Sequence, residues 1–267
     1  MQSAIELRGV TKRFLTPSGS VYTALRDLTM TVGEGEFCAV VGPTGCGKST
    51  TLALISGLEP ASEGGVEVFG KPVDGIADGI GYMFQADAVF PWKSVLENVA
   101  AGPRYHGAST RDARDRAREW ITRVGLAGFE DRYPYQLSGG MRKRVALAQS
   151  LINGPRILLM DEPFSALDVQ TRSLMENELL GLWAASSASV VFVTHDLEEA
   201  ISLSDRVFVI TAGPGTVKSN YKVDLPRPRN VAEIRFQPHF IEIYEEIWKD
   251  LKDEVLVSYE RQKRGVA

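Results

Sequence analysis

The spacing of apolar and polar residues along the chain predicts strands and helices in an α/β order. Residues 25–32 alternate between apolar and polar side chains, which is typical of a half-buried strand. Residues 37–41 are a continuous apolar run, which predicts a strand covered on both faces. A Gly-rich stretch over 42–47 follows, and 48–58 has the pattern of a helix. Strand, loop and helix in this order open a nucleotide-binding α/β unit.

The middle of the chain has a helical pattern. Residues 87–154 include two segments with helical spacing, 111–124 and 139–151, and no convincing strand. We therefore expect a helical subdomain inserted at about 87–154. Around it the α/β pattern predicts strands at 66–69, 80–84, 157–160, 189–194 and 206–210 and helices at 168–184 and 197–203.

The C-terminal part predicts a separate amphipathic helix. Pro226-Arg227-Pro228-Arg229 indicates the end of the compact part. Beyond it, apolar residues recur three or four positions apart and form one helix face: Phe240, Tyr244, Ile247, Leu251 and Val255. A tail helix docked on its own domain is the favoured interpretation, and a partner-binding helix is the other. The expected division is a domain over 1–225 and a C-terminal extension over 226–267.

Composition and charge narrow the class of protein. The 267 residues include 30 basic and 34 acidic side chains, so a broad basic surface is absent and we expect no nucleic-acid partner. The longest apolar runs, such as 157–160, are far shorter than the roughly 20 residues of a membrane-spanning helix. We see no secretory signal. The two cysteines, Cys38 and Cys46, lack metal-site spacing and are expected to be reduced thiols in a cytosolic protein.

The sequence Gly42-Pro43-Thr44-Gly45-Cys46-Gly47-Lys48-Ser49 matches the spacing of a P-loop. Glycines let successive backbone N–H groups point inward at phosphate oxygens, and the N-terminus of the next helix adds its positive dipole end. Lys48 would place a charge near the β- and γ-phosphates, and the Ser49 hydroxyl could bind Mg²⁺. Kinases, GTPases and motor ATPases share this loop. It therefore predicts nucleotide binding but does not indicate what the nucleotide is used for.

An acidic pair narrows the chemistry. Asp161 and Glu162 follow the apolar run 157–160, at the strand end where ligands lie in open α/β sheets. Asp161 would hold Mg²⁺ and Glu162 would polarise the attacking water, although a pair of acids can also cap the next segment. General-base assistance of this kind is typically worth ~10²–10⁴-fold in rate.

Further motifs connect the chain to a family. Leu137-Ser138-Gly139-Gly140-Met141, directly before a predicted helix, resembles the signature sequence of the ATP-binding cassette (ABC) ATPases. Other matches follow in the family's order over roughly residues 4–225: Gln85 resembles the Q-loop, Ser165-Ala166-Leu167-Asp168 the D-loop, and Thr194-His195-Asp196 the switch histidine. Phe14 stands where the family places an aromatic residue that stacks on adenine. The loop over 15–21 is longer than in many relatives, so Tyr22 is a second candidate for that contact.

The resemblance implies an α/β P-loop NTPase fold: a RecA-like core with an antiparallel β subdomain, plus the helical subdomain of the ABC ATPase type. It also implies two ATP molecules sandwiched in a head-to-tail dimer, formed by this chain twice or with a paralogue. In that dimer the signature faces the partner's P-loop, His195 holds the γ-phosphate and the attacking water, and Gln85 senses Mg²⁺ and the partner.

The expected site residues follow from the motifs and the resemblance together. The expected catalytic residues are Lys48, Gln85, Glu162 and His195; the expected Mg²⁺ ligands are Ser49, Gln85 and Asp161; the expected ATP contacts are Phe14, Gly42, Pro43, Thr44, Gly45, Cys46, Gly47, Lys48, Ser49, Thr50, Ser138, Gly139, Gly140 and Asp168. Met141 replaces the usual glutamine of the signature, but the essential donors precede it.

Three short motifs resemble the nitrate, sulfonate and taurine group of importer ATPases: Phe90-Pro91-Trp92, the methionine of the signature, and Gly213-Pro214-Gly215. This resemblance implies a peripheral protein at the cytoplasmic face of the inner membrane. It would power uptake of a small solute through separate transmembrane permease subunits that work with an extracytoplasmic solute-binding protein. Residues 86–99 would then form the groove that receives a permease helix. The alternative is that they serve only the local packing of the insertion. The alternative function is a soluble ABC-family ATPase in DNA repair or translation; the signature and the switch histidine argue against a metabolite kinase.

Overall fold

The computed structural model describes residues 3–86, 88–165 and 167–263, which form two compact units. The first unit combines the described residues of 1–78 with those from 188 onward, and the second comprises 79–187. Residue 87, where the predicted insertion begins, and Ala166 of the D-loop motif lie outside the described residues. Within the described part of the chain, no helix is long and apolar enough to cross a lipid bilayer.

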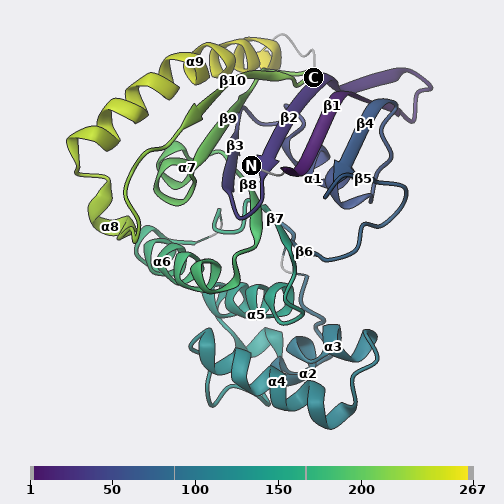
Figure 1. The fold of residues 1–267 in the computed structure, drawn as a ribbon, viewed down its shortest axis with the longest axis vertical. Coiled ribbons are helices and arrows are strands. Elements are labelled where there is room, and N and C mark those ends of the chain that lie inside the picture. Colours follow the sequence, from purple (N-terminus) through teal and green to yellow (C-terminus); the bar gives the residue numbers. More distant parts are fainter. Residues whose placement is uncertain (1–2, 87, 166, 264–267) are drawn as a thin grey trace. The chain divides into compact units, whose positions relative to one another are not determined.

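The first unit is built on two sheets (Figure 1). Its strands are β1 (Ser3–Leu15), β2 (Val21–Gly33), β3 (Phe37–Val41), β4 (Glu63–Val68), β5 (Lys71–Pro72), β8 (Ser189–Thr194), β9 (Arg206–Ile210) and β10 (Val217–Lys222), and its helices are α1 (Lys48–Ser56), α7 (Leu197–Leu203), α8 (Val231–Ile234) and α9 (Pro238–Lys263). One sheet runs in the order β10-β9-β3-β8 and the other in the order β2-β1-β4-β5. Helix α1 contacts strands of both sheets, and α7 packs on β3, β8 and β9.

The parallel strands of the first unit carry the predicted nucleotide loop. β3 is buried along its whole length, as its continuous apolar run predicts. It pairs in parallel with both β8 and β9, and Val41 lies opposite Thr194 and Val209. The segments that follow β3, β8 and β9 therefore leave the sheet at the same edge. Cys38 and Cys46 are buried free thiols, in agreement with the prediction.

The antiparallel sheet differs from the sequence expectation at its first strand. β1 has no clear alternating pattern, and we predicted no strand there. Its pairing with β2 shifts register at several points, between Leu7 and Val10 and again near Lys12. Each shift moves the next residue to the other face, so buried positions no longer alternate with exposed ones. Alternation of apolar and polar residues therefore does not reveal this bulged strand in the sequence.

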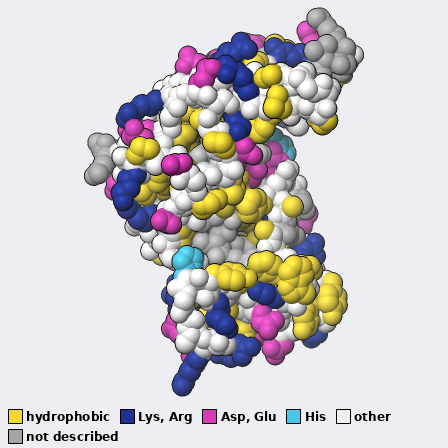
Figure 2. Space-filling model, turned by 90° about the vertical axis from the view of Figure 1, so that its right-hand side faces the viewer, with side chains coloured by type: hydrophobic (Ala, Val, Ile, Leu, Met, Phe, Trp, Pro, Cys, Tyr) yellow, Lys and Arg dark blue, Asp and Glu magenta, His cyan; other side chains and the backbone are white. Residues whose placement is uncertain are grey.

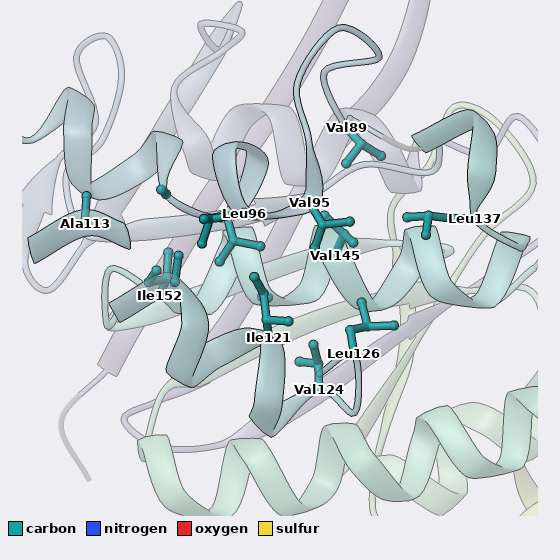
Figure 3. Packing of buried hydrophobic residues seen from close by; sticks show 14 residues of the cluster. Val89, Val95, Leu96, Ala113, Ile121, Val124, Leu126, Leu137, Val145 and Ile152 are labelled. Atoms are coloured by element: carbon teal, nitrogen blue, oxygen red, sulfur yellow. The ribbon is translucent and has the colours of Figure 1, made fainter. Parts of the chain in front are cut away.

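The second unit joins a parallel strand pair to a group of helices. Its elements are β6 (Ile80–Met83), β7 (Ile157–Asp161), α2 (Val95–Val99), α3 (Ala101–Tyr105), α4 (Thr110–Arg123), the 3₁₀ helix η1 (Pro134–Gln136), α5 (Gly139–Leu151) and α6 (Val169–Ser186). Figure 3 shows how α2, α4 and α5 enclose a core of their own, to which Val95, Ile121 and Val145 contribute fully buried side chains. The helices α2 to α5 correspond to the predicted insertion over 87–154. The compact unit is wider, because α5 also packs on β6 and α6.

The C-terminal extension belongs to the first unit. The segment 226–229, where we predicted the compact part to end, is tied into it by Arg229, which is 7% exposed. Helix α9 docks on α7, β9 and β10, which confirms the favoured interpretation of a tail helix on its own domain. Its buried stripe consists of Phe240, Ile243, Ile247 and Leu251, whereas Tyr244 is half-buried and Val255 is 39% exposed. The predicted face is therefore correct in its first half and turns away from the sheet at Val255.

Candidate functional site

The loop between β3 and α1 holds a backbone shape that glycine adopts easily. Gly45 and Gly47 have φ angles of 77° and 100°, in the left-handed region. A Cβ atom on Gly47 would lie 2.5 Å from the Leu25 side chain, so a larger residue does not fit there. Gly47 is the N-cap of α1 and supplies no side-chain acceptor to the first amide groups of that helix. Such a helix N-terminus is suited to a phosphate.

Lys48 places a buried charge in this loop. Its side chain is only 6% exposed, and its Nζ donates hydrogen bonds to the carbonyl oxygens of Gly42 at 2.9 Å and Pro43 at 3.0 Å. Among the residues that the structure describes, no carboxylate pairs with this ammonium group. A buried cation is costly without a counter-ion. The phosphates of a nucleotide would supply that negative charge, so the loop fits the predicted ligand.

The two candidates for the adenine contact are neighbours across β1 and β2. Phe14 and Tyr22 lie directly opposite one another, and such pairs share one face of a sheet. The Nζ of Lys12 lies 4.8 Å from the centre of the Phe14 ring and covers one side of it. Tyr22 is 45% exposed, and its hydroxyl donates to the Gly45 carbonyl oxygen at 3.4 Å. The contact with the P-loop gives Tyr22 a second link to the site that the sequence did not indicate.

The switch histidine follows the strand next to the P-loop. Because Val41 and Thr194 are register partners, Gly42 and His195 begin adjacent segments at one edge of the sheet. The turn is fixed by Thr194, whose Oγ1 donates to Glu199 Oε2 at 2.6 Å, and by Asp196, which caps α7. His195 itself is exposed. The first unit thus places Tyr22 against the P-loop, Phe14 beside Tyr22, and His195 at the strand end next to the one that opens the P-loop.

In the second unit, the strand pair brings the Q-loop to the acidic motif. Met83 and Met160 are register partners in the parallel β6–β7 pair, so Gln85 and Glu162 follow neighbouring strand ends. Gln85 Nε2 donates to Glu162 Oε2 at 3.2 Å. Asp161, the last residue of β7, is 7% exposed. Glu162 has φ 44°, a left-handed conformation that is uncommon for a residue with a side chain.

The signature lies at the start of α5. Ser138 is the N-cap and accepts a hydrogen bond from the Met141 amide at 3.3 Å, and both Ser138 and Gly139 are exposed. A Cβ atom on Gly140 would lie 3.1 Å from the Thr171 side chain of α6. Asp168 caps α6 by accepting from the Thr171 amide at 3.0 Å, and this bond holds the pKa of Asp168 below its usual value. Thr171 therefore connects the signature to the end of the D-loop.

Lys143 was missed in the sequence analysis. It is 4% exposed on α5, and its Nζ donates to the Gln85 carbonyl oxygen at 2.8 Å. The signature helix is thereby tied to the Q-loop, which in turn contacts Glu162. A lysine that follows the signature has the helical spacing of an inward position, but the sequence does not show what it meets.

A groove of about 760 Å³ lies in the second unit beside the Q-loop. It is lined by residues of β6, of the segment after it and of α5, among them Tyr82, Phe84, Ala88, Phe90, Ala146, Gln149, Ser150 and Asn153. The rings of Tyr82 and Phe84 stack with centroids 4.2 Å apart. Figure 2 shows apolar side chains gathered on the surface of the second unit. Within the predicted segment 86–99, Phe90 lines the groove, Val89 packs in the helical core and Trp92 is 70% exposed.

Comparisons with known proteins agree with the motifs. Residues 25–165 match the family model described as ABC transporter. The chain is 46% identical to an ABC transporter ATP-binding protein of Methanocaldococcus jannaschii, over 97% of this chain and 95% of that protein. It is 40% identical to the nitrate import ATP-binding protein of Synechocystis sp., over 91% and 93% of the two chains. It is 36% identical to the taurine import ATP-binding protein of Jannaschia sp., over 95% and 97%.

Solved structures give the same family. The fold is similar to the dimeric post-hydrolysis state of an ATP-binding cassette bound to ADP and phosphate. The two share 33% identity with a TM-score of 0.73, over 83% of this chain and all of the other. These matches confirm the P-loop NTPase fold and the family predicted from the signature. This chain therefore belongs to the ABC transporter family, and within that family it is an ATP-binding protein and an ATPase.

Proposed function

We propose that this chain is the ATP-hydrolysing subunit of an importer of the nitrate, sulfonate and taurine type, and that it powers uptake of a small solute through separate permease subunits. The observation that carries the proposal is the groove on the second unit. Strand β6 runs along this groove and leads into Gln85, which bonds Glu162. A permease helix seated in the groove would touch the strand that ends at the proposed catalytic pair. Relatives named as import ATP-binding proteins support the direction of transport.

The proposed chemistry assigns one role to each motif. The β- and γ-phosphates are bound by the backbone of residues 42–49 and by the Lys48 ammonium. Thr50, in the first turn of α1, is a further ATP contact. Glu162 accepts a proton from the attacking water, and His195 holds the γ-phosphate. Adenine stacks on Phe14 or on Tyr22, which face the same side of their sheet.

A magnesium ion fits the oxygen donors of the motifs. The Ser49 hydroxyl, the Gln85 amide oxygen and the Asp161 carboxylate are hard oxygen ligands of the kind that Mg²⁺ prefers. When bound, Mg²⁺ would neutralise negative charge on the phosphates. The buried strand end places the Asp161 carboxylate where water competes weakly for it.

The proposed assembly has three further partners. The exposed Ser138 and Gly139, together with Gly140 and Asp168, would contact ATP bound to a second ATPase subunit, either a copy of this chain or a paralogue. The permease subunits would hold the pair as peripheral proteins at the cytoplasmic face of the inner membrane. An extracytoplasmic solute-binding protein would deliver the solute.

The test is affinity purification of the tagged chain from detergent-solubilised membranes of its host, with partners identified by mass spectrometry. We expect a polytopic permease in near-equal amount. Ala88→Arg places a long charged side chain in the exposed wall of the groove and is expected to abolish copurification while ATP binding is kept. Ala127→Arg, at an exposed position outside the groove, is the matched control.

Other outcomes decide against the proposal. Ribosomal or DNA-repair partners without a membrane protein would favour the soluble ABC ATPase. Copurification that survives Ala88→Arg would place the permease contact elsewhere on the chain.

A further inference from the structure

The loop that carries the Gly213-Pro214-Gly215 motif packs against the P-loop. Residues 211–216 connect β9 to β10. A Cβ atom on Gly215 would lie 2.0 Å from the Cys46 carbonyl oxygen, and one on Gly213 would lie 3.8 Å from the Gly45 carbonyl oxygen. Glycine at position 215 thus allows a backbone-to-backbone approach that a larger residue would prevent, whereas Gly213 lies at ordinary van der Waals distance. The position of this loop therefore limits where the backbone of the P-loop can lie.

The loop is closed by hydrogen bonds of its own. The Thr211 amide donates to the Thr216 carbonyl at 3.0 Å, and the Thr211 hydroxyl donates to the Pro214 carbonyl at 3.2 Å. Its far side is joined to β2, because the Gly215 amide donates to the Ala24 carbonyl at 2.8 Å. These bonds link the two ends of the loop, so Ala212 and Gly215 belong to one hydrogen-bonded turn.

Two charged side chains of α9 form hydrogen bonds with this loop. Glu254 Oε2 accepts a hydrogen bond from the Ala212 amide at 2.8 Å. Arg261, two helical turns further on, donates through Nη1 to the Ala212 carbonyl at 3.1 Å and also to the Gly213 carbonyl. Lys218 Nζ lies 2.9 Å from Glu254 Oε1 and fixes the carboxylate. Both the backbone amide and the backbone carbonyl of Ala212 are thus hydrogen-bonded to side chains of α9.

We propose that Glu254 and Arg261 are positioning residues of the nucleotide site: they hold loop 211–216 against the P-loop and so keep the phosphate-binding backbone in its curve. The inference rests on the proposed function, because the site that they support is the proposed ATP site. Neither residue is placed at the nucleotide itself. Glu254 also lies close enough to act on Cys46: burial raises the pKa of this thiol most, Lys48 lowers it, and the charge of Glu254 adds the smallest upward contribution. The C-terminal extension is therefore part of the ATP-binding apparatus, and lifting the last turns of α9 weakens ATP binding.

The test uses the full chain with Glu254→Ala and Arg261→Met. We measure the Kd for ATP by calorimetry, the KM and kcat of hydrolysis, and the Tm without nucleotide. Loss of one hydrogen bond that fixes the loop is expected to raise Kd and KM roughly fivefold, with kcat kept. Arg261→Lys retains a donor and is expected to recover most of the affinity. Glu245→Ala and Lys252→Met change exposed charges on the same helix and are expected to bind ATP like the wild type.

The outcomes separate this inference from the proposed function. If Glu254→Ala and Arg261→Met lower the Tm but leave Kd unchanged, α9 is only a structural cover and the inference is overturned. It is also overturned if Arg261→Lys is as weak as Arg261→Met. If the wild-type chain does not bind ATP, or binds it equally well after Lys48→Ala, the proposed site itself fails.

Discussion

Two residues at the proposed site have an unfavourable environment or conformation. The Lys48 ammonium is buried between two carbonyl oxygens. Glu162 adopts φ 44°, which costs of order 1 kcal/mol or more for a residue other than glycine. Unfavourable conformations of this kind persist where the surrounding structure imposes them, and they cluster at active sites. Both residues belong to the motifs that the sequence indicated.

The first prediction concerns Lys48. Lys48→Ala removes one charge that faces the phosphates and is expected to weaken ATP binding by roughly 10- to 100-fold, since a charge-assisted hydrogen bond is worth about 1.5–3 kcal/mol. Calorimetric titration with ATP measures the change. Lys71→Ala, at an exposed position of β5, is the control and should leave the affinity as it is. An unchanged affinity of Lys48→Ala would count against the P-loop as the phosphate site.

At the scale of elements, two arginine side chains join the segment after β10 to α7. Arg227 Nη2 donates to the Leu203 carbonyl oxygen at 2.7 Å, and Arg229 makes several bonds. Arg229 donates to the carbonyl oxygens of Ser204 at 2.7 Å and Leu225 at 3.0 Å, and also to those of Ile201, Ser202 and Val223. Burial, followed by the positive charge of Arg227, lowers the pKa of Arg229 to about 10. The group therefore stays charged at neutral pH. It supplies partners to the last carbonyls of α7, which lack partners within the helix.

We expect Arg229→Met to lower the free energy of unfolding by about 3 kcal/mol, because several buried carbonyl oxygens lose their donor. Urea denaturation followed by circular dichroism gives the value. Lys222→Met changes an exposed cation at the end of β10 and should shift stability by less than about 0.5 kcal/mol. Equal effects of the two substitutions would show that the Arg229 bonds contribute little.

The docking of α9 is expected to depend on pH through His239. Its ring nitrogens contact Glu242 at 3.0 Å and Asp224 at 2.6 Å, and these contacts raise the pKa of His239 above 6.5. The protonated form is thus favoured in the folded state. The stabilisation is complete below the unfolded pKa near 6.5 and is lost as pH rises through the higher folded value.

The measurement is the Tm at about pH 6 and about pH 8, for the wild type and for His239→Gln. The wild type should lose more of its Tm on going to the higher pH than the variant does. A parallel pH dependence of the two proteins would mean that His239 does not contribute.

At the scale of the whole molecule, the proposed assembly places the exposed signature against ATP bound to a second subunit. Glu162→Gln is expected to bind ATP but to hydrolyse it ~10²–10⁴-fold more slowly, because the proposed general base is lost. ATP then remains between two copies, and light scattering should show a doubled mass when ATP is added. Ser138→Arg in the same background should restore the single mass while the chain still binds ATP. A monomer under all conditions would contradict the sandwich for the isolated subunit.

The sequence itself determined the chemistry and most of the regular elements. P-loop, acidic pair and signature are each contiguous, so their residue types and spacing carry their meaning without a fold. Elements with an uninterrupted pattern, namely the apolar runs of β3 and β8 and the helical spacing of α5, begin and end where their pattern does. Where a bulge disturbs the period, as in β1, the pattern gives no signal.

Only the tertiary structure decided which distant residues meet. Gln85 and Glu162 are joined because parallel pairing of β6 and β7 aligns their ends. Phe14 and Tyr22 share a face because of the register of β1 and β2, and Glu254 reaches Ala212 because α9 docks on β9 and β10. The segment 226–229, predicted as the end of the compact part, is likewise packed into the first unit through the buried Arg229 side chain. Such contacts depend on strand order, register and packing, which arise from the whole chain at once and leave no local pattern to read.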